Sequence, residues 1–240
     1  IETIELIKKP VPGKNIYLSL DKKVQFIGYD ILKKYVKKDK AESASLVLIK
    51  NKTGEIISMV NYPSFNPENR IEMHGVNIKN RAVTESFEPG STIKPFTIYT
   101  ALKDKVFNKK SIIDTSPGIL KIGEYEIKDY KYLGKLTLAE IIQQSSNVGA
   151  ALVALKTSKR SIHNTLQELN FGETLYMGLP GEQSGKLDHY SSWGESQHAS
   201  MGYGYGLSTT LLHLANAYSV LAAINLLVCV PVNYLFLDNI

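Results

Sequence analysis

The chain has 240 residues and a formal net charge of +5 at pH 7, a length that fits one large domain or two small ones. A single cysteine, Cys229, excludes an internal disulfide and any site built from several cysteines. The five histidines show no metal-ligand spacing, so neither a metal site nor a cofactor is expected.

Much of the excess positive charge comes from lysines in residues 8–40. Such a pattern can indicate binding to nucleic acid or to an anionic membrane surface. Most of these lysines fall on the polar side of one predicted helix, and no stripe of aromatic and basic residues accompanies them. They are interpreted as a solvated helix face, and no nucleic-acid partner is expected.

The chain begins at Ile1 rather than Met and has no N-terminal apolar signal, so it is predicted to be a fragment of a longer protein. Residues 1–12 contain two prolines and are predicted to be a linker from a preceding module. Residues 15–20 then read as a short strand.

Regular elements follow in chain order. Asp21 is predicted to cap a helix that carries apolar residues such as Ile27 and Ile31 on one side and lysines on the other. Strand-like runs at 45–50 and 55–60, separated by a turn with Gly54, predict a hairpin. Residues 61–88 form a long polar connection, which often marks a functional loop before a site.

The second half of the chain reads as mostly helical. Thr137 followed three residues later by Glu140 is a capping box that opens a short helix. The other predicted elements are helices at 92–102, 148–156, 161–169 and 209–222 and a small hairpin at 120–127. The uncharged stretch 218–237 is interpreted as a buried helix followed by a buried strand at 226–230 or 233–237, with a membrane span as the alternative.

Ser91 and Lys94 carry the clearest chemical signal. Pro89-Gly90 breaks the incoming segment, so Ser91 lies at a helix start and Lys94 lies one turn further on the same face. A partly desolvated lysine can be neutral enough to take the serine proton, which gives the pair the parts for acyl transfer. The helix N-terminus suits a developing oxyanion. A bare Ser-x-x-Lys is more often an N-capped surface helix, so context must decide.

Ser145 and Asn147 lie at a break between two predicted helices. Two polar side chains at such a break can be helix caps and nothing more. In the functional interpretation, the Ser145 hydroxyl passes a proton and the Asn147 amide holds a substrate amide on one exposed turn.

Taken together, Ser91-x-x-Lys94 and Ser145-x-Asn147 match in type and order the first two signatures of the penicillin-recognising serine acyltransferases. From about residue 13 to its end, the chain resembles the class B penicillin-binding proteins, specifically the division-type (FtsI-like) peptidoglycan transpeptidases. Asn147 favours the division type, because elongation-type relatives usually carry aspartate there. The stretches that carry the resemblance are Asn66-Pro67, residues 87–95, residues 178–182 and the glycine-tyrosine run 202–207.

The resemblance implies a role for each residue that matches a motif. Ser91 would attack the penultimate D-alanine carbonyl of a stem peptide ending in D-Ala-D-Ala, and Lys94 would be its base. Ser145 would relay a proton to the leaving amine, and Asn147 would hold the substrate amide and help position Lys94. The Ser91 N–H would form half of the oxyanion hole. β-Lactam antibiotics would acylate the same serine.

The resemblance also implies the setting of the protein. The fold would be α+β, the penicillin-binding protein transpeptidase or serine β-lactamase-like fold, with an antiparallel sheet and a mostly helical subdomain. An upstream anchor would place the domain, residues 13–240, on the outer side of a bacterial cytoplasmic membrane. A lipid-linked-glycan polymerase and other division proteins would be its partners.

One departure limits the resemblance. The third family signature, Lys-Thr/Ser-Gly on an edge strand, would follow the glycine-tyrosine run, but the only such triplet, Lys52-Thr53-Gly54, precedes Ser91. The domain is therefore expected to be incomplete at its C-terminus, and this chain to be inactive or poorly acylated. A β-lactam sensor, a serine β-lactamase and a non-catalytic division scaffold remain as alternatives, although the Glu-Pro-Gly before Ser91 argues against the first two.

Overall fold

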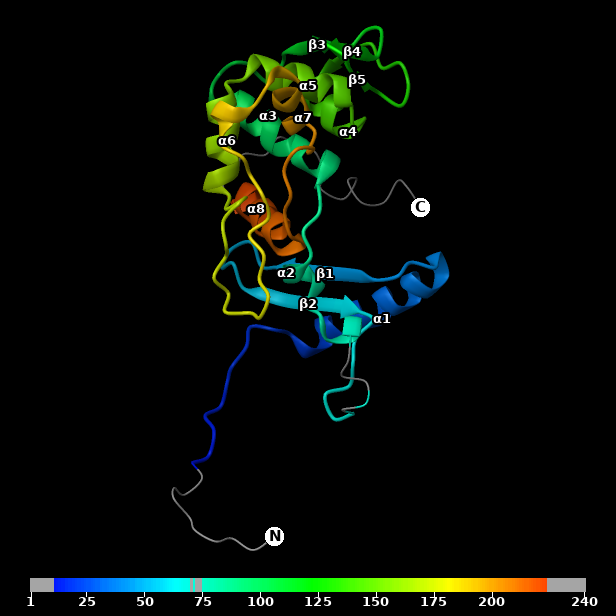
Figure 1. Ribbon diagram of the computed structural model, residues 1–240, viewed down its shortest axis with the longest axis vertical. Helices are drawn as coiled ribbons and strands as arrows, with labels where there is room; N and C mark the ends of the chain where they lie inside the picture. Colours follow the sequence, from blue (N-terminus) through cyan, green and yellow to red (C-terminus); the bar gives the residue numbers. More distant parts are fainter. Residues whose placement is uncertain (1–10, 70, 72–74, 224–240) are drawn as a thin grey trace, which may run out of the picture.

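The structure is a computed structural model that describes residues 11–69, 71 and 75–223 (Figure 1). Its elements gather in two regions, a small sheet with α1 and α2 at one end and a larger helical region at the other, with α8 between them. Helices and antiparallel strand pairs occur together, so the α+β class is confirmed.

In the smaller region, β1 (Ala44–Ile49) and β2 (Ile56–Tyr62) form an antiparallel hairpin, as predicted. Helix α1 (Lys22–Asp39) packs along β2, and the Asp21 side chain caps it by accepting from two backbone N–H groups of its first turn. Gly28 permits this close packing, because a Cβ there would lie 3.2 Å from Val60. The helix and its cap were both predicted correctly.

The strand predicted at 15–20 is wrong. Residues 11–20 form no strand, and side chains such as Tyr17 are largely exposed. Single hydrogen bonds link the end of this segment and the following Asp21 to β2, from Ser19 Oγ to the Ile56 carbonyl and from Asp21 N to the Ile57 carbonyl. The predicted linker, residues 1–12, lies almost entirely outside the described residues.

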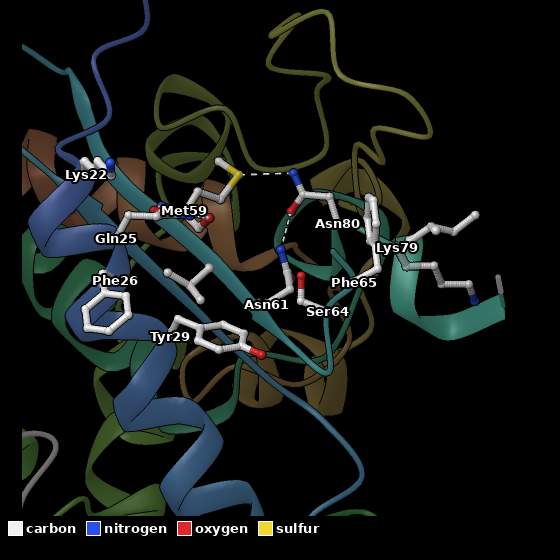
Figure 2. Close-up of a pocket in the computed structure, with 12 residues that line it drawn as sticks. Lys22, Gln25, Phe26, Tyr29, Met59, Asn61, Ser64, Phe65, Lys79 and Asn80 are labelled. Carbon is white, nitrogen blue, oxygen red and sulfur yellow. Dashed lines mark hydrogen bonds between the residues drawn. The ribbon is translucent and has the colours of Figure 1, made fainter. Parts of the chain in front are cut away.

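A surface pocket lies between α1 and β2 (Figure 2). Phe26 and Tyr29 of α1 form one side of it, and Asn61 of β2 faces Asn80 across the other. Asn61 Nδ2 donates to Asn80 Oδ1 at 2.9 Å, so these amides fasten the end of β2 to the start of α2 (Arg81–Thr84). None of the four predicted catalytic and substrate-binding residues lines this pocket.

The larger region surrounds α3 (Lys94–Lys103), seven of whose ten residues are buried. Phe96 packs with Phe171 and Tyr218 on one side, and Ile98 packs with Ile113 and Ile141 on the other. The surrounding helices are α4 (Leu138–Gln143), α5 (Asn147–Lys156), α6 (Lys159–Glu168), α7 (Glu195–Met201) and α8 (Leu211–Ala223). Helix α8 also contacts β1, which connects the two regions.

Short strands and 3-10 turns complete the region. The strand pairs are β3 (Ile112–Asp114) with β6 (Lys135–Thr137), and β4 (Ile119–Ile122) with β5 (Tyr125–Lys128). The 3-10 turns are η2 (Gly75–Ile78), η3 (Gly90–Ile93) and η4 (Tyr190–Ser192).

Most sequence predictions for this half of the chain are confirmed. The hairpin at 120–127 is the β4–β5 pair, Thr137 and Glu140 form the expected capping box, and helices α5, α6 and α8 begin and end within two residues of their predictions. The strands predicted at 226–230 or 233–237 lie outside the described residues. Within the described ranges, no helix is long and apolar enough to cross a membrane.

Candidate active site

The segment before Ser91 turns sharply into α3. Gly90 has a φ of +55°, which a residue with a side chain rarely adopts, and η3 starts there before α3 continues from Lys94. Ser91 therefore lies in the first turn, where backbone N–H groups have no partner within the helix. The predicted helix at 92–102 is confirmed, with a 3-10 first turn.

The glycine-tyrosine run packs against this turn. Gly90 N donates to the Gly204 carbonyl at 3.0 Å, and Gly206 N donates to Glu88 Oε1 at 3.0 Å. Thr97 Oγ1 of α3 donates to the Gly202 carbonyl at 3.0 Å. The interpretation of this run as closely packed backbone is confirmed, and these hydrogen bonds hold the turn that carries Ser91.

The four predicted site residues meet around the Lys94 amine. Lys94 is only 1% exposed, and its Nζ lies 2.9 Å from Ser91 Oγ, 2.6 Å from the Ser145 carbonyl, 3.0 Å from Ser145 Oγ and 2.8 Å from Asn147 Oδ1. Ser145 Oγ also donates to Ser91 Oγ at 2.9 Å. Ser91 and Ser145 are themselves exposed, so a substrate can reach both hydroxyls.

Burial lowers the pKa of Lys94 from its ordinary 10.5 to about 8, because the charged amine loses hydration. The negative charge of Asp129 acts in the opposite direction and limits this fall. With a pKa of about 8, roughly a tenth of the molecules carry a neutral Lys94 at pH 7. Lys94 is thus suited to accept a proton near neutral pH.

Ser145 adopts an unusual backbone conformation. Its φ is +52°, which is uncommon for a residue other than glycine and is found mostly at turns and functional sites. Ser145 follows the end of α4, and its N–H donates to the Ile142 carbonyl at 3.1 Å. This conformation directs both the carbonyl and the hydroxyl of one residue at Lys94.

Local sequence explains how Asn147 is placed. Ser146 is the N-cap of α5, and its Oγ accepts from Gly149 N at 2.8 Å. Gly149 must lack a side chain, because a Cβ there would lie 2.8 Å from Ile141 of α4. The break between α4 and α5 is therefore tight, and Ser146, rather than Ser145 or Asn147, is the residue whose side chain caps α5.

Asp129 was missed from the sequence. It follows β5, and its carboxylate accepts from Ser146 Oγ at 2.7 Å, Asn147 N at 2.6 Å and Val148 N at 3.1 Å. No local pattern distinguishes Asp129 from a solvent-exposed turn aspartate such as Asp104, because its contacts lie 17 to 19 residues further along the chain.

The Lys52-Thr53-Gly54 triplet does not join this cluster. Its three residues are exposed in the β1–β2 turn, where Thr53 Oγ1 donates to Glu55 at 2.7 Å. None of them is a hydrogen-bond partner of Lys94. Among the described residues, no group of three or more histidine, cysteine or acidic side chains could hold a metal ion.

Comparison with known proteins identifies the family. The family described as "Penicillin binding protein transpeptidase domain" matches residues 44–228. The chain belongs to this family. It is 38% identical over 222 residues to the probable peptidoglycan D,D-transpeptidase PbpC of Pseudomonas aeruginosa, and this match covers 92% of this chain and 39% of that relative. It is 37% identical over 209 residues to the peptidoglycan D,D-transpeptidase FtsI of Escherichia coli, and this match covers 87% of this chain and 35% of that relative.

Solved structures agree with the family. The transpeptidase domain of penicillin-binding protein 3 from Burkholderia pseudomallei matches with a TM-score of 0.79 at 35% identity, over 89% of this chain and 60% of that one. A peptidoglycan glycosyltransferase from Burkholderia ambifaria also matches with a TM-score of 0.79 at 35% identity, over 86% of this chain and 61% of that one. The penicillin-binding protein transpeptidase fold expected from the sequence is therefore confirmed. The chain spans about two fifths of the length of the first curated relatives it matches.

Proposed function

We propose that a protein containing this chain is a serine D,D-transpeptidase that cross-links peptidoglycan stem peptides ending in D-Ala-D-Ala during septal cell-wall synthesis. The observation that carries this proposal is the buried Lys94 amine, 2.9 Å from the exposed Ser91 hydroxyl and in contact with Ser145 and Asn147. Relatives named D,D-transpeptidases, 37–39% identical over most of the chain, support it.

In the first step, Ser91 Oγ attacks the carbonyl carbon of the penultimate D-alanine. A C–O bond forms while Lys94 takes the hydroxyl proton. A neutral amine has two N–H donors and one lone pair. The Ser145 carbonyl at 2.6 Å and Asn147 Oδ1 at 2.8 Å accept the two donors, which leaves the lone pair for the Ser91 proton.

Collapse of the tetrahedral intermediate breaks the C–N bond of the D-Ala-D-Ala peptide. The proton passes from Lys94 through Ser145 Oγ, 3.0 Å away, to the leaving amine, and the terminal D-alanine departs. The amine of a neighbouring stem peptide then attacks the Ser91 ester, which forms the cross-link and restores the hydroxyl. Asn147 holds the substrate amide during both steps.

β-Lactams would acylate Ser91 by the same attack on their ring carbonyl. The Ser91 N–H supplies one oxyanion donor, and the family's Lys-Thr/Ser-Gly strand would supply the second. No such triplet follows Ser91 in these 240 residues. Since loss of one oxyanion donor costs roughly 10²- to 10³-fold in rate, we expect this chain alone to be acylated slowly or not at all.

Intact-mass analysis after incubation with benzylpenicillin tests the proposal, with Ser91→Ala as the matched control. One added penicilloyl mass that disappears in Ser91→Ala supports the acyl-enzyme. A longer protein that contains this chain and is folded but never acylated contradicts it. Rapid loss of the adduct together with nitrocefin turnover would indicate a serine β-lactamase instead.

The cellular setting is part of the same proposal. A membrane anchor would hold the domain on the outer side of a bacterial cytoplasmic membrane, beside a lipid-linked-glycan polymerase and other division proteins. The relatives named FtsI support the division assignment. If a full-length protein with Ser91→Ala still supported division, a scaffold role would replace the enzymatic one.

A further inference from the structure

Asp129 and the preceding residue, Lys128, hold Asn147 in place through hydrogen bonds. Asp129 Oδ1 accepts from Asn147 N at 2.6 Å and from Val148 N at 3.1 Å, and the Lys128 carbonyl accepts from Asn147 Nδ2 at 3.2 Å. The backbone and the side-chain amide of Asn147 are thus both fixed by two consecutive residues.

The side-chain contact sets the orientation of the Asn147 amide. Because Nδ2 points to the Lys128 carbonyl, Oδ1 must point the other way, where it accepts from Lys94 Nζ at 2.8 Å. Asp129 itself is tied to the neighbouring loop by its N–H, which donates to the Gly118 carbonyl at 3.1 Å. Asp129 is therefore linked to the Lys94 amine through one residue, Asn147.

Asp129 is not the N-cap of α5. Ser146 is the N-cap, and its Oγ accepts from Gly149 N at 2.8 Å. Asp129 Oδ2 in turn accepts from the Ser146 hydroxyl at 2.7 Å. The carboxylate adds a negative charge beside a buried amine, and this charge raises the pKa of Lys94 against the effect of burial. The neighbouring Lys128 amine pairs with Glu126 at 2.6 Å.

We propose that Asp129 is a positioning residue of this active site, which orients the Lys94 amine through Asn147 and holds a balancing negative charge beside it. The role deepens the proposed transpeptidase function and rests on it. Asp129 contacts neither the nucleophile nor a reacting atom, so its effect on the reaction passes through Asn147 and Lys94.

Asp129→Asn separates charge from geometry. The asparagine Oδ1 can keep both backbone N–H bonds, and its Nδ2 can donate to Ser146 Oγ. The hydrogen bonds that hold Asn147 are thus retained while the charge is removed. Glu140→Gln is the matched control, because Glu140 is also a helix-capping carboxylate that accepts from Thr137 N at 2.8 Å. Glu140 is not among the groups that shift the pKa of Lys94.

The first measurement is the titration of Lys94 by NMR in protein labelled with ¹³C at lysine Cε, assigned with a Lys94→Met variant. We expect the Lys94 midpoint to move to lower pH in Asp129→Asn and to stay unchanged in Glu140→Gln. Asp129→Glu, which keeps the charge, should restore the midpoint towards the wild-type value. A lower melting temperature with an unchanged midpoint in Asp129→Asn would overturn the proposal, because a helix cap alone produces that result.

The second measurement is the pH profile of Ser91 acylation by a fluorescent penicillin. The acidic limb should move to lower pH in Asp129→Asn in parallel with the NMR midpoint. Absence of acylation in the folded wild type of the longer protein would count against the proposed function, while the Lys94 titration would still decide the role of Asp129. Asp129→Ser repeats the test if Asp129→Asn unfolds, and unfolding of both neutral variants would overturn the positioning role in favour of a structural one.

Discussion

Gly204 and Gly90 are in direct backbone contact, although 113 residues of sequence lie between them. Gly90 N donates to the Gly204 carbonyl at 3.0 Å, and a Cβ on residue 204 would overlap the Gly90 carbonyl. Gly204 also has a φ of +90°, which residues with a side chain rarely adopt. The glycine-tyrosine run therefore fixes the turn that presents Ser91.

Gly204→Ala should destabilise the fold by about 2–4 kcal/mol and reduce Ser91 acylation, because both the overlap and the positive φ must be relieved by moving the Gly90 turn. Urea unfolding measures the first effect, and penicillin labelling of a longer protein that contains this chain measures the second. Gly178→Ala is the control, since Gly178 has a φ of +72° and a methyl group there would meet no atom within 4 Å. Equal losses in both variants would contradict the importance of the Gly204–Gly90 contact.

Phe96 provides a separate test of the packing around α3. Its side chain is fully buried, and its ring lies 5.9 Å from Phe171 and 5.1 Å from Tyr218 in edge-to-face geometry. Phe96→Ala should cost about 3–5 kcal/mol in the free energy of unfolding. Phe26→Ala, at a side chain that is 64% exposed, should change it by less than about 0.5 kcal/mol. Similar losses in both would show that α3 is not the centre of the core.

Much of the site could be predicted from sequence because its determinants are local. Ser91 and Lys94 share a helix face through their three-residue spacing, and Thr137 and Glu140 form a capping box within one turn. The position of Ser145 and Asn147 beside Lys94 required the family resemblance, since 51 and 53 residues separate them from it in the chain.

Sequence reasoning was wrong or silent where the outcome depends on distant partners. Apolar residues alternate at Ile16, Leu18 and Leu20, which is typical of a strand, yet no neighbouring strand pairs with this segment among the described residues. Asp129 was overlooked for the same reason, because a carboxylate reveals its role only when the N–H groups it accepts from are placed. Local sequence patterns predict helices and strands, whereas the hydrogen-bond partners of a strand or a carboxylate depend on the tertiary structure.

Lys94 predicts how acylation depends on pH. Since only the neutral amine can take the Ser91 proton, the acylation rate should rise about tenfold per pH unit below pH 8 and level off above it. Stopped-flow labelling of a longer protein that contains this chain, between about pH 5.5 and 9.5, measures the profile. Lys94→Met should reduce the rate by about 10²- to 10⁴-fold and remove this limb. A flat wild-type profile would exclude Lys94 as the base.

The same pKa makes a prediction about stability. The unfolded chain releases its Lys94 proton near pH 10.5 and the folded chain near pH 8, so the unfolded state binds more protons between these values. The free energy of unfolding should therefore rise with pH in this window, by about 3 kcal/mol from Lys94. Lys94→Met lacks this contribution, and the difference between the two proteins in urea unfolding at about pH 7.5 and 10.5 isolates it. A difference that does not change with pH would contradict the lowered pKa.

Asn147→Asp tests the electrostatics from the opposite direction to Asp129→Asn. A carboxylate in place of Asn147 Oδ1, 2.8 Å from Lys94 Nζ, would form a direct ion pair and raise the pKa of Lys94. The acidic limb of acylation should then move to higher pH, with a rate at pH 7 lower by about tenfold or more. The new carboxylate also loses the bond that Asn147 Nδ2 donates to the Lys128 carbonyl at 3.2 Å, so part of the loss should persist at high pH. Asn164→Asp on the exposed face of α6 adds the same charge away from the site and should leave the profile unchanged. If Asn147→Asp instead left the limb in place, the contact between Asn147 and Lys94 would not control the protonation of the amine.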